Sequence, residues 1–408
     1  MSLIKPFRGL RPSAHHAADV AAPPYDVLST DEARLRADGR PWSFLHISKP
    51  EIDLPPSTDP YAPQVYAKAV ENLNRMLAAG ILHRDARPCY YAYRLQMGEH
   101  VQTGFVVAAS VAAYDSGRIK KHEFTRPDKE DDRVRQIEAL NAQTGPVLLA
   151  YPPSPRADAL LAQASAGAPT AEVVADDGIH HTLWQVADET LISDITAAFE
   201  RMRSLYIADG HHRSAAASRV AAARRKSGNE QASDYFLAVI FPHHQMKILD
   251  YNRVVKDLNG LTEADFLARV CEHYTVTAAE TPVKPALPGE VGLYLPGRWF
   301  RIAIDPKLIP ADPVARLDVS LLSDHLLGPV LGITDLRRDK RIDFVGGIRG
   351  LPELEKRVNS GEMAAAFAMH PTSLADLMAV ADAGQVMPPK STWFEPKLAD
   401  GLVSQVLD

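Results

Sequence analysis

Apolar residues recur at helical spacing along one stretch of the chain, between Tyr61 and Gly80. The positions that would share one helical face are Val65, Ala69, Leu73, Met76 and Leu77. Spacings of three and four residues place side chains on the same side of a helix, and a glycine commonly follows the last turn. We therefore expect an amphipathic helix here, lying on the surface of the fold.

Strand patterns flank a short turn further along the chain. The runs 89–97 and 104–111 are rich in β-branched and aromatic residues, and Gly98, Glu99 and His100 lie between them, which predicts an antiparallel hairpin. A helix over 190–203, a strand over 205–208 and a helix after Asp209 and Gly210 then alternate. This alternation is typical of α/β proteins, and we expect an α/β fold with a mixed sheet.

The remaining patterns predict strands over 235–241, 248–255, 291–295, 299–304 and 363–369. Further helices are expected through about 142, after the cap Thr262, from the N-cap Asp312 and Pro313 to 327, and over 372–383. Residues 152–170 are rich in Ala, Ser and Pro and are expected to form a peripheral excursion. Because the composition shifts near residue 260, we expect a catalytic lobe over 1–260 and a C-terminal α/β lobe over 261–408.

Composition excludes several classes of protein. Apolar residues make up 46% of the 408 positions and charged residues 24%, as in an ordinary folded enzyme. The net charge of −6 argues against a sequence-independent DNA binder. No stretch has the length of a signal peptide or a membrane span, so a cytoplasmic protein without a membrane partner is expected. Cys89 and Cys271 are too isolated for a disulfide framework or a cysteine–zinc site.

The run Leu205–Arg213 carries the clearest chemistry. Asp209 and Gly210 follow a short strand, and His211, His212 and Arg213 begin an Ala-rich helix. A helix N-terminus favours anions, so cationic side chains there suit the binding of phosphate better than they suit stability. A plainer interpretation pairs Arg213 with Asp209 and the histidines with local carboxylates. A zinc site is disfavoured, because adjacent helical residues point apart.

A second group of polar residues precedes and enters a helix. His122 and Glu123 are followed by Thr125, Arg126 and Arg133. A carboxylate beside cations could take a hydroxyl proton and offset the charge of a transferred phosphoryl group, whereas a solvated charged face is the alternative.

Two proline-rich segments complete the candidates. Lys390, Ser391 and Thr392 resemble a phosphate-binding loop in residue type but lack its glycines, and a surface turn is the alternative. The turn after Pro23 and Pro24 presents Tyr25 and Asp26, which could hold substrate or fix the amino-terminal strand.

Taken together, several of these segments resemble, in order and over nearly the whole chain, domain-of-unknown-function family 1015. They are residues 5–11, 20–27, 122–125, 209–213 and 387–398. Separately, residues 206–213 are similar to the phosphate-binding element of the ParB and sulfiredoxin superfamily, and to the same element of its archaeal free serine kinases. That resemblance implies a ParB/sulfiredoxin-like core that holds a nucleotide with Asp209, Gly210, His211, His212 and Arg213. Because His211 takes the position of the sulfiredoxin cysteine, sulfinic acid reduction is not expected.

The resemblance also implies a kinase that uses ATP or ADP with Mg²⁺ to convert free L-serine to O-phosphoserine. In the archaeal kinases a glutamate is the base, and here Glu123 is the first candidate, Asp26 the next and Asp209 a third. We assign Glu123, Asp209 and His211 to catalysis. The residues assigned to phosphate binding are 209–213 and 390–392, and those assigned to the substrate are Tyr25, Asp26, His122, Thr125, Arg126 and Arg133.

Two other functions stay open. A ParB-like switch would bind and hydrolyse a nucleotide to change partners, and a non-catalytic metabolite-binding protein would tolerate Glu123→Gln. The nucleotide, the acceptor, the metal ligands and the choice between monomer and homodimer are not determined by the sequence.

Overall fold

The computed structural model describes residues 2–225 and 230–408, which divide into two units. Unit 1 runs to Met246 and resumes at Pro396, and unit 2 is Lys247–Glu395. The division therefore falls before residue 260, because the strand β14 (Tyr251–Val255) pairs with β18 and β19 inside the sheet of unit 2. The chain end belongs to unit 1, because β21 (Ser404–Val406) pairs with β2 and β7.

Unit 1 is built on a mixed sheet with the strand order β6-β11-β8-β12-β5-β4-β10-β9, and β1 pairs with β5. Most neighbours in this sheet are antiparallel, whereas β8–β12 and β6–β11 are parallel, so the expected mixed α/β fold is confirmed. The strands are β1 (Ile4–Lys5), β4 (Tyr90–Met97), β5 (His100–Ser110), β6 (Ile119–Lys120), β8 (Val147–Tyr151), β9 (Ala171–Val174), β10 (His180–Val186), β11 (Leu205–Asp209) and β12 (Tyr235–Pro242). The predicted hairpin is confirmed as β4–β5.

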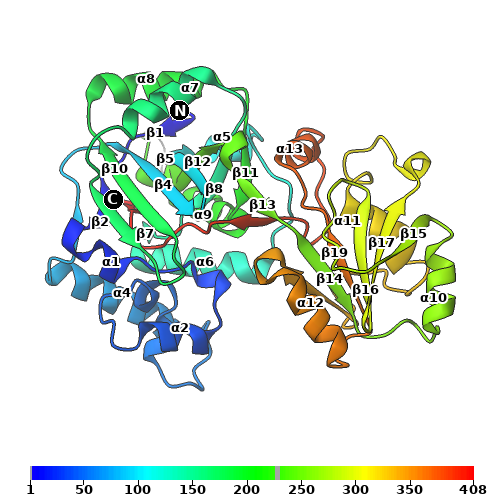
Figure 1. Cartoon of the computed structure of the whole chain (residues 1–408). Helices are drawn as coiled ribbons and strands as arrows, with labels where there is room; N and C mark the ends of the chain where they lie inside the picture. Colours follow the sequence, from blue (N-terminus) through cyan, green and yellow to red (C-terminus); the bar gives the residue numbers. More distant parts are fainter. Residues whose placement is uncertain (1, 226–229) are drawn as a thin grey trace. The chain divides into compact units, whose positions relative to one another are not determined.

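Helices cover both faces of this sheet, with α7 and α8 on one side and α9 on the other (Figure 1). The central strands β8 and β12 are accordingly buried along their whole length. The helices of unit 1 are α1 (Ala17–Val20), α2 (Thr30–Ala37), α3 (Leu45–Ser48), α4 (Pro63–Ala78), α5 (Val111–Asp115), α6 (Pro127–Leu140), α7 (Pro155–Ala164), α8 (Glu189–Glu200) and α9 (His211–Arg224).

Three expectations for unit 1 can be compared with this arrangement. The amphipathic helix over 61–80 is confirmed as α4, which buries Val65, Ala69, Leu73 and Met76. The helix after Gly210 is confirmed as α9. Residues 152–170 are not peripheral, because α7 packs Leu160 and Leu161 into the main hydrophobic core.

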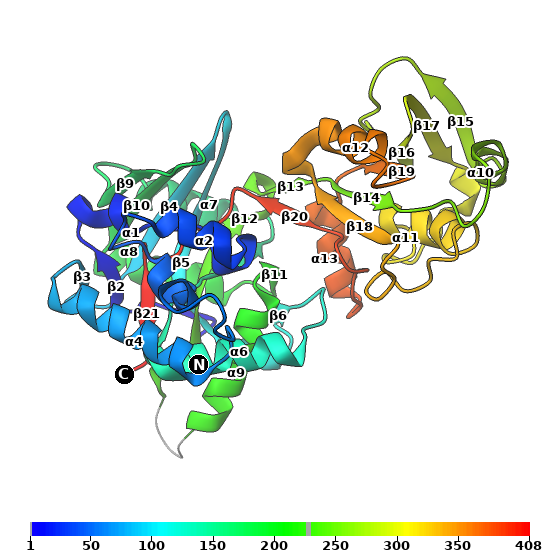
Figure 2. The same cartoon turned by 90° about the horizontal axis from the view of Figure 1, so that it is seen from below.

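A small four-stranded sheet with the order β3-β2-β21-β7 joins the two ends of unit 1. Its strands are β2 (Gly9–Pro12), β3 (Leu82–Arg84), β7 (Ala142–Gln143) and β21. Figure 2 shows β21 beside β2, and α6 beside α9. This sheet brings the carboxyl-terminal segment next to the elements that carry the candidate chemistry.

Unit 2 contains a six-stranded antiparallel sheet with the order β15-β17-β16-β19-β14-β18, and a separate pair formed by β13 and β20. Its strands are β13 (Lys247–Leu249), β14, β15 (Tyr274–Ala279), β16 (Glu290–Leu295), β17 (Arg298–Ile304), β18 (Ile342–Gly346), β19 (Ala365–Met369) and β20 (Trp393–Glu395). Its helices are α10 (Glu263–Val270), α11 (Asp318–Leu322), α12 (Gly350–Asn359) and α13 (Leu374–Asp382), and a π-helical turn, Ser323–Leu327, continues α11.

Two predictions for unit 2 are wrong in detail. The strand expected over 248–255 is divided at Asp250 into β13 and β14, which belong to different sheets. The helix expected from Pro313 begins only at Asp318, because Asp312 caps a turn by accepting the N–H groups of Val314 and Ala315. The cap Thr262 is confirmed, since its side chain accepts the N–H of Asp265.

Candidate functional site

The turn between β11 and α9 depends on Gly210. This residue is the N-cap of α9 and has a φ of 97°, a left-handed conformation that favours glycine. The Oδ1 of Asp209 accepts the N–H of Gly210 at 2.8 Å. A β-carbon at position 210 would lie 3.2 Å from Nε of Arg213 and 3.3 Å from Cα of Val147. The glycine therefore allows both the sharp turn and the close packing of the arginine.

Replacement of Gly210 by alanine should lower the free energy of unfolding of unit 1 by roughly 1–3 kcal/mol, because of backbone strain and the tight contact with Arg213. Gly178→Ala is a matched control, since Gly178 also has a positive φ but nothing within 4 Å of an added β-carbon. Urea unfolding followed by circular dichroism compares the two variants. Equal losses would show that packing against Arg213 adds nothing.

The first turn of α9 offers unpaired donors. Within residues 2–225 and 230–408, no acceptor is found for the backbone N–H groups of His211, His212 and Arg213, whereas the N–H of Ser214 already bonds to Gly210. Unpaired N–H groups and the positive end of the helix dipole attract anions. This helix end can therefore bind a phosphate group.

Arg213 is buried and lies among carboxylates. Its Nη2 is 3.7 Å from a carboxylate oxygen of Asp26 and 3.7 Å from one of Asp209, and its Nη1 donates to the carbonyl of Pro146. Burial disfavours the charged form, but Asp26 and Asp209 outweigh it, so the pKa of Arg213 is raised. The ion pair between Arg213 and Asp209, which the plainer interpretation of the sequence expected, is therefore present.

Asp209 is held in its ionised form. Burial alone would raise its pKa, but Lys397, Arg213 and His211 together keep the pKa of Asp209 well below its usual range. Its Oδ2 lies 3.6 Å from Nζ of Lys397. Because a carboxylate that stays ionised is a poor proton acceptor, Asp209 is the weakest of the three candidate bases.

The two histidines of α9 hold the loop that carries Glu123. The backbone N–H of His122 donates to Nε2 of His211 at 3.5 Å, and the backbone N–H of Arg126 donates to Nε2 of His212 at 3.1 Å. A ring nitrogen that accepts a hydrogen bond must be unprotonated, so in the neutral ring Nδ1 carries the proton. Burial is the largest cause that lowers the pKa of both rings, which therefore stay neutral.

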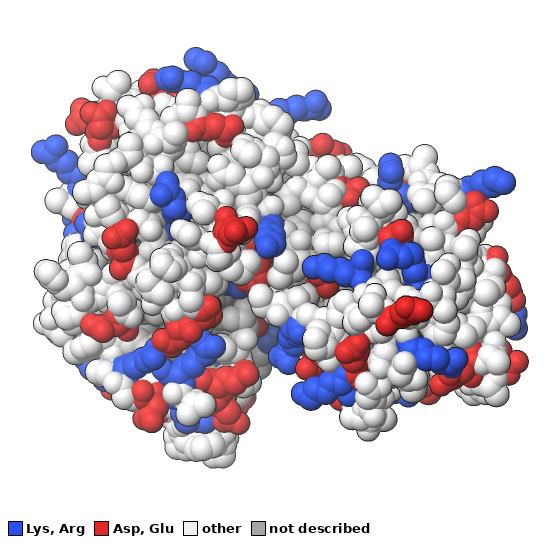
Figure 3. Space-filling view, in the orientation of Figure 1, with Lys and Arg blue, Asp and Glu red and all other residues white. Residues whose placement is uncertain are grey.

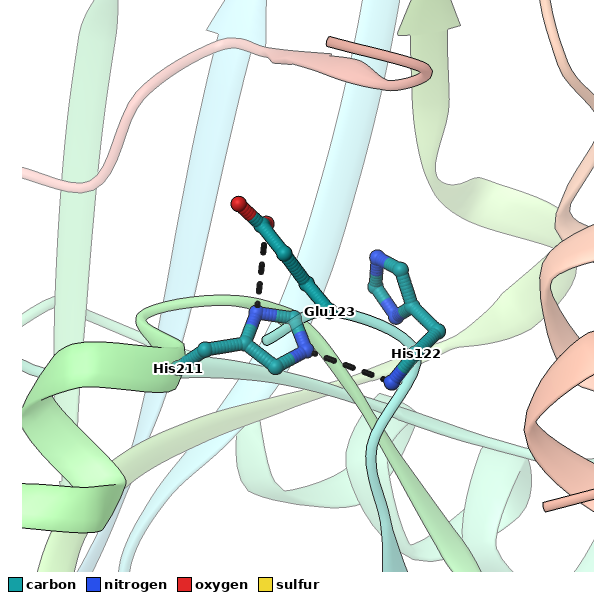
Figure 4. Close-up of side chains that lie close together, drawn as sticks. All are labelled: His122, Glu123 and His211. Carbon is teal, nitrogen blue, oxygen red and sulfur yellow. Dashed lines mark hydrogen bonds and ion pairs between the residues drawn. The ribbon is translucent and has the colours of Figure 1, made fainter. Parts of the chain in front are cut away.

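Glu123, His122 and His211 form the cluster shown in Figure 4. Nδ1 of His211 faces the carboxylate of Glu123 at 3.7 Å, and the two imidazole rings meet edge to face with centroids 4.5 Å apart. Burial lowers the pKa of His122 to about 4, although the Ile207 carbonyl and Asp209 act in the opposite direction. The half-exposed carboxylate of Glu123 thus lies close to two neutral imidazole rings, those of His122 and His211.

The same three residues are the one group of metal-ligand type found in the described part of the chain, since their ligand atoms lie within 4.8 Å of one another. The fit to a metal is poor. Nε2 of His211 accepts a backbone N–H, which leaves the proton on the Nδ1 that would have to bind the ion. Two imidazoles also do not suit Mg²⁺, which prefers oxygen ligands. The half-exposed carboxylates of Asp26 and Asp209 are the better oxygen donors for Mg²⁺.

Two further candidates meet next to Arg213. The guanidinium of Arg133 stacks on the ring of Tyr25, 3.8 Å from its centroid, and bonds to Asp132 at 2.6 Å. Burial raises the pKa of Tyr25 to about 12, so its hydroxyl keeps its proton. Tyr25 and Asp26 are held beside the chain end through the bridge between Ala22 and Asp400. The structure therefore brings Tyr25, Asp26, Arg133 and Arg213 together.

The other predicted site residues interact with residues outside the group around Arg213. Thr125 donates to Glu130, and the exposed Arg126 forms an ion pair of 2.7 Å with Asp128. Lys390, Ser391 and Thr392 belong to unit 2, where Arg253 donates to the carbonyl of Lys390 at 3.1 Å. Their assignment to phosphate binding stays a prediction.

Sequence reasoning missed Asp132, Ser48 and Asp400. Each is buried in unit 1 close to the candidate residues. Asp132 directly precedes its partner Arg133 in α6. Ser48 and Asp400 lie in no motif, and Asp400 is separated from Arg213 by 187 positions of sequence, so no local pattern could have indicated their contacts.

On the face shown in Figure 3, Lys and Arg residues are interspersed with Asp and Glu residues.

No helix within residues 2–225 and 230–408 has the length and apolar character needed to cross a bilayer.

Comparisons with known proteins complete this description. No curated protein matches the chain. A free serine kinase in complex with AMP is 16% identical, with 73% of this chain and 92% of that chain covered and a TM-score of 0.36. A conserved hypothetical protein from Pyrococcus furiosus is also 16% identical, with 73% and 95% covered and a TM-score of 0.36. SbnI from Staphylococcus aureus, truncated at its C-terminus, is 12% identical, with 72% and 85% covered and a TM-score of 0.37. Residues 4–320 match the family described as "Protein of unknown function (DUF1015)", and the chain belongs to that family.

Proposed function

We propose that this chain is a nucleotide-dependent small-molecule kinase. The observation that carries the proposal is the proximity of two features in unit 1. The start of α9 presents unpaired N–H groups beside Arg213, and Glu123 lies 3.7 Å from His211 of the same turn. The first feature supports phosphate binding, and the second supports proton transfer next to that phosphate.

In the proposed reaction, the Glu123 carboxylate takes the proton of the acceptor hydroxyl. The hydroxyl oxygen then forms a bond to the terminal phosphorus of the nucleotide, and the bond from that phosphorus to its bridging oxygen breaks. The electron pair leaves with the shortened nucleotide. Arg213 and the N–H groups of α9 offset the negative charge, and the Nδ1–H of His211 orients the carboxylate. Mg²⁺, bound with ATP or ADP and the carboxylates of Asp26 or Asp209, would neutralise phosphate charge.

The best candidate acceptor is free L-serine, which follows from the similarity of residues 206–213 to the element of the free serine kinases. The purified chain should convert L-serine to O-phosphoserine when it is incubated with Mg²⁺ and either ATP or ADP, with the product detected by mass spectrometry. The absence of product with serine and with a panel of other hydroxyl metabolites would contradict the kinase. Nucleotide-dependent oligomerisation without product would favour a ParB-like switch.

A further inference from the structure

A cavity that Arg213 helps to line lies entirely within unit 1. The space inside it amounts to about 450 Å³ when the part that is open to solvent is counted. The side chains that matter for its chemistry are Tyr25, Ser48, Arg133, Gln136, Arg213 and Asp400. These side chains come from five separate segments of the chain, which meet only in the folded state.

Two of the lining residues have hydrogen-bonding capacity that the described residues leave unused. Oγ of Ser48 and Oδ1 of Asp400 are buried and have no hydrogen-bond partner in residues 2–225 and 230–408. Gln136, by contrast, already donates to the carbonyl of Ile47 at 2.8 Å. Unpaired buried polar atoms are rare and destabilising, so we expect a group of a ligand to form the missing hydrogen bonds.

Gly145 keeps the space between the opposite charges free. A β-carbon at this position would lie 3.6 Å from Oδ1 of Asp400, 3.3 Å from Cδ of Arg213 and 4.0 Å from its Nη1. Asp400 and Arg213 form no ion pair within 4.0 Å, although both are buried and line the same cavity. Buried opposite charges that share a cavity without direct contact can be bridged by a ligand.

We propose that this cavity binds the acceptor of the reaction, a small α-amino acid, whose ammonium group pairs with Asp400 and whose carboxylate pairs with Arg133 and Arg213. An ammonium group supplies N–H donors for Oδ1 of Asp400 and Oγ of Ser48, which have no hydrogen-bond partner among the described residues. A guanidinium carries five N–H donors, and Asp132 and the Pro146 carbonyl take up only part of those of Arg133 and Arg213. A nucleobase is the poorer match, because it carries no charge to compensate the buried Asp400. This inference rests on the proposed kinase function, and it assigns the binding site of the acceptor.

The effect of the buried Asp400 on stability supports a role in binding. Burial raises the pKa of Asp400 to about 7, against the attraction of Arg213 and Arg133, and Asp26 adds to the rise. In the unfolded chain an aspartate titrates near pH 4. As the pH rises from about 4 to about 7, the unfolded state therefore loses its proton first, and the folded state loses stability. A carboxylate that destabilises the folded protein is typical of a functional residue.

The variant Asp400→Asn tests both the effect of Asp400 on stability and its proposed role in ligand binding. The variant should melt a few degrees higher than the wild type at pH 8, with no difference near pH 4, and it should bind L-serine at least about tenfold more weakly. Asp194→Asn, on the exposed surface of α8, is the control and should change neither property. Melting is followed by calorimetry, and binding by isothermal titration of the full chain without nucleotide.

The ligand panel tests the two charges separately. L-serine and L-alanine should bind, whereas ethanolamine, which lacks the carboxylate, and D-glycerate, which lacks the ammonium group, should bind at least tenfold more weakly. Gly145→Ala, which has no strained φ and fills the gap, should also weaken the binding of L-serine. Adenosine binding that is sensitive to Gly145→Ala would overturn the proposal, as would L-serine binding unchanged by Asp400→Asn, or no binding of either amino acid.

These outcomes are distinguishable from failure of the kinase. If neither amino acid binds but another hydroxyl compound is phosphorylated, the cavity proposal is wrong and the kinase stands. If L-serine binds through Asp400 but no nucleotide yields a phosphorylated product, the cavity stands and the kinase is wrong.

Discussion

Replacing Arg213 by alanine should lower the free energy of unfolding of unit 1 by about 3–5 kcal/mol, the largest effect that we expect from one substitution on stability. The guanidinium is buried next to Asp26 and Asp209, and its removal leaves carboxylates without their cation. It also deletes the donor to the Pro146 carbonyl. Chemical denaturation of the full chain, followed by circular dichroism, measures the loss.

Arg156→Ala is the matched control, because Arg156 pairs with Asp194 on the surface and its loss should cost at most about 1 kcal/mol. Nucleotide affinity is better tested with Arg213→Lys, which keeps the charge but loses the planar fork, and we expect that variant to bind ADP more weakly. A loss of stability in Arg213→Ala no larger than in Arg156→Ala would contradict the structural part of this role.

Glu123→Gln should reduce turnover by about 10²- to 10⁴-fold, because the amide cannot take the hydroxyl proton. The KM for the nucleotide and the melting temperature should change little, since the side chain is half-exposed and its neighbour His211 lies 3.7 Å away. Steady-state kinetics with L-serine and either ATP or ADP give both parameters.

Glu172→Gln, an exposed position on β9, serves as the control for Glu123→Gln. Turnover that is retained in Glu123→Gln, with product still formed, would exclude Glu123 as the base. Asp26 would then become the first alternative, because the ionised state of Asp209 is already stabilised by Lys397 and Arg213.

Local patterns predicted much of the fold. Helical spacing predicted α4, β-branched runs predicted the β4–β5 hairpin, and the aspartate–glycine turn predicted the start of α9. These features depend on residues within a few positions of one another. The return of the chain end to unit 1 was not predicted, because β21 has three residues and pairs with strands hundreds of positions away.

The candidate site was predicted in pieces rather than as a whole. Glu123 and His211 were selected for their chemistry, but their proximity depends on the packing of α6 against α9. The roles of the two histidines were only partly anticipated, since each also accepts a backbone N–H from the Glu123 loop. Asp400 carries no local signal, because its environment is created by segments remote from it in sequence.

The central claim is that the start of α9 binds the phosphates of a nucleotide. A crystal structure of the chain grown with ADP and Mg²⁺ tests it most directly. We predict phosphate oxygens within hydrogen-bonding distance of the N–H groups of His211, His212 and Arg213. Phosphates bound elsewhere in the chain, with those N–H groups facing only water or protein, would contradict the account.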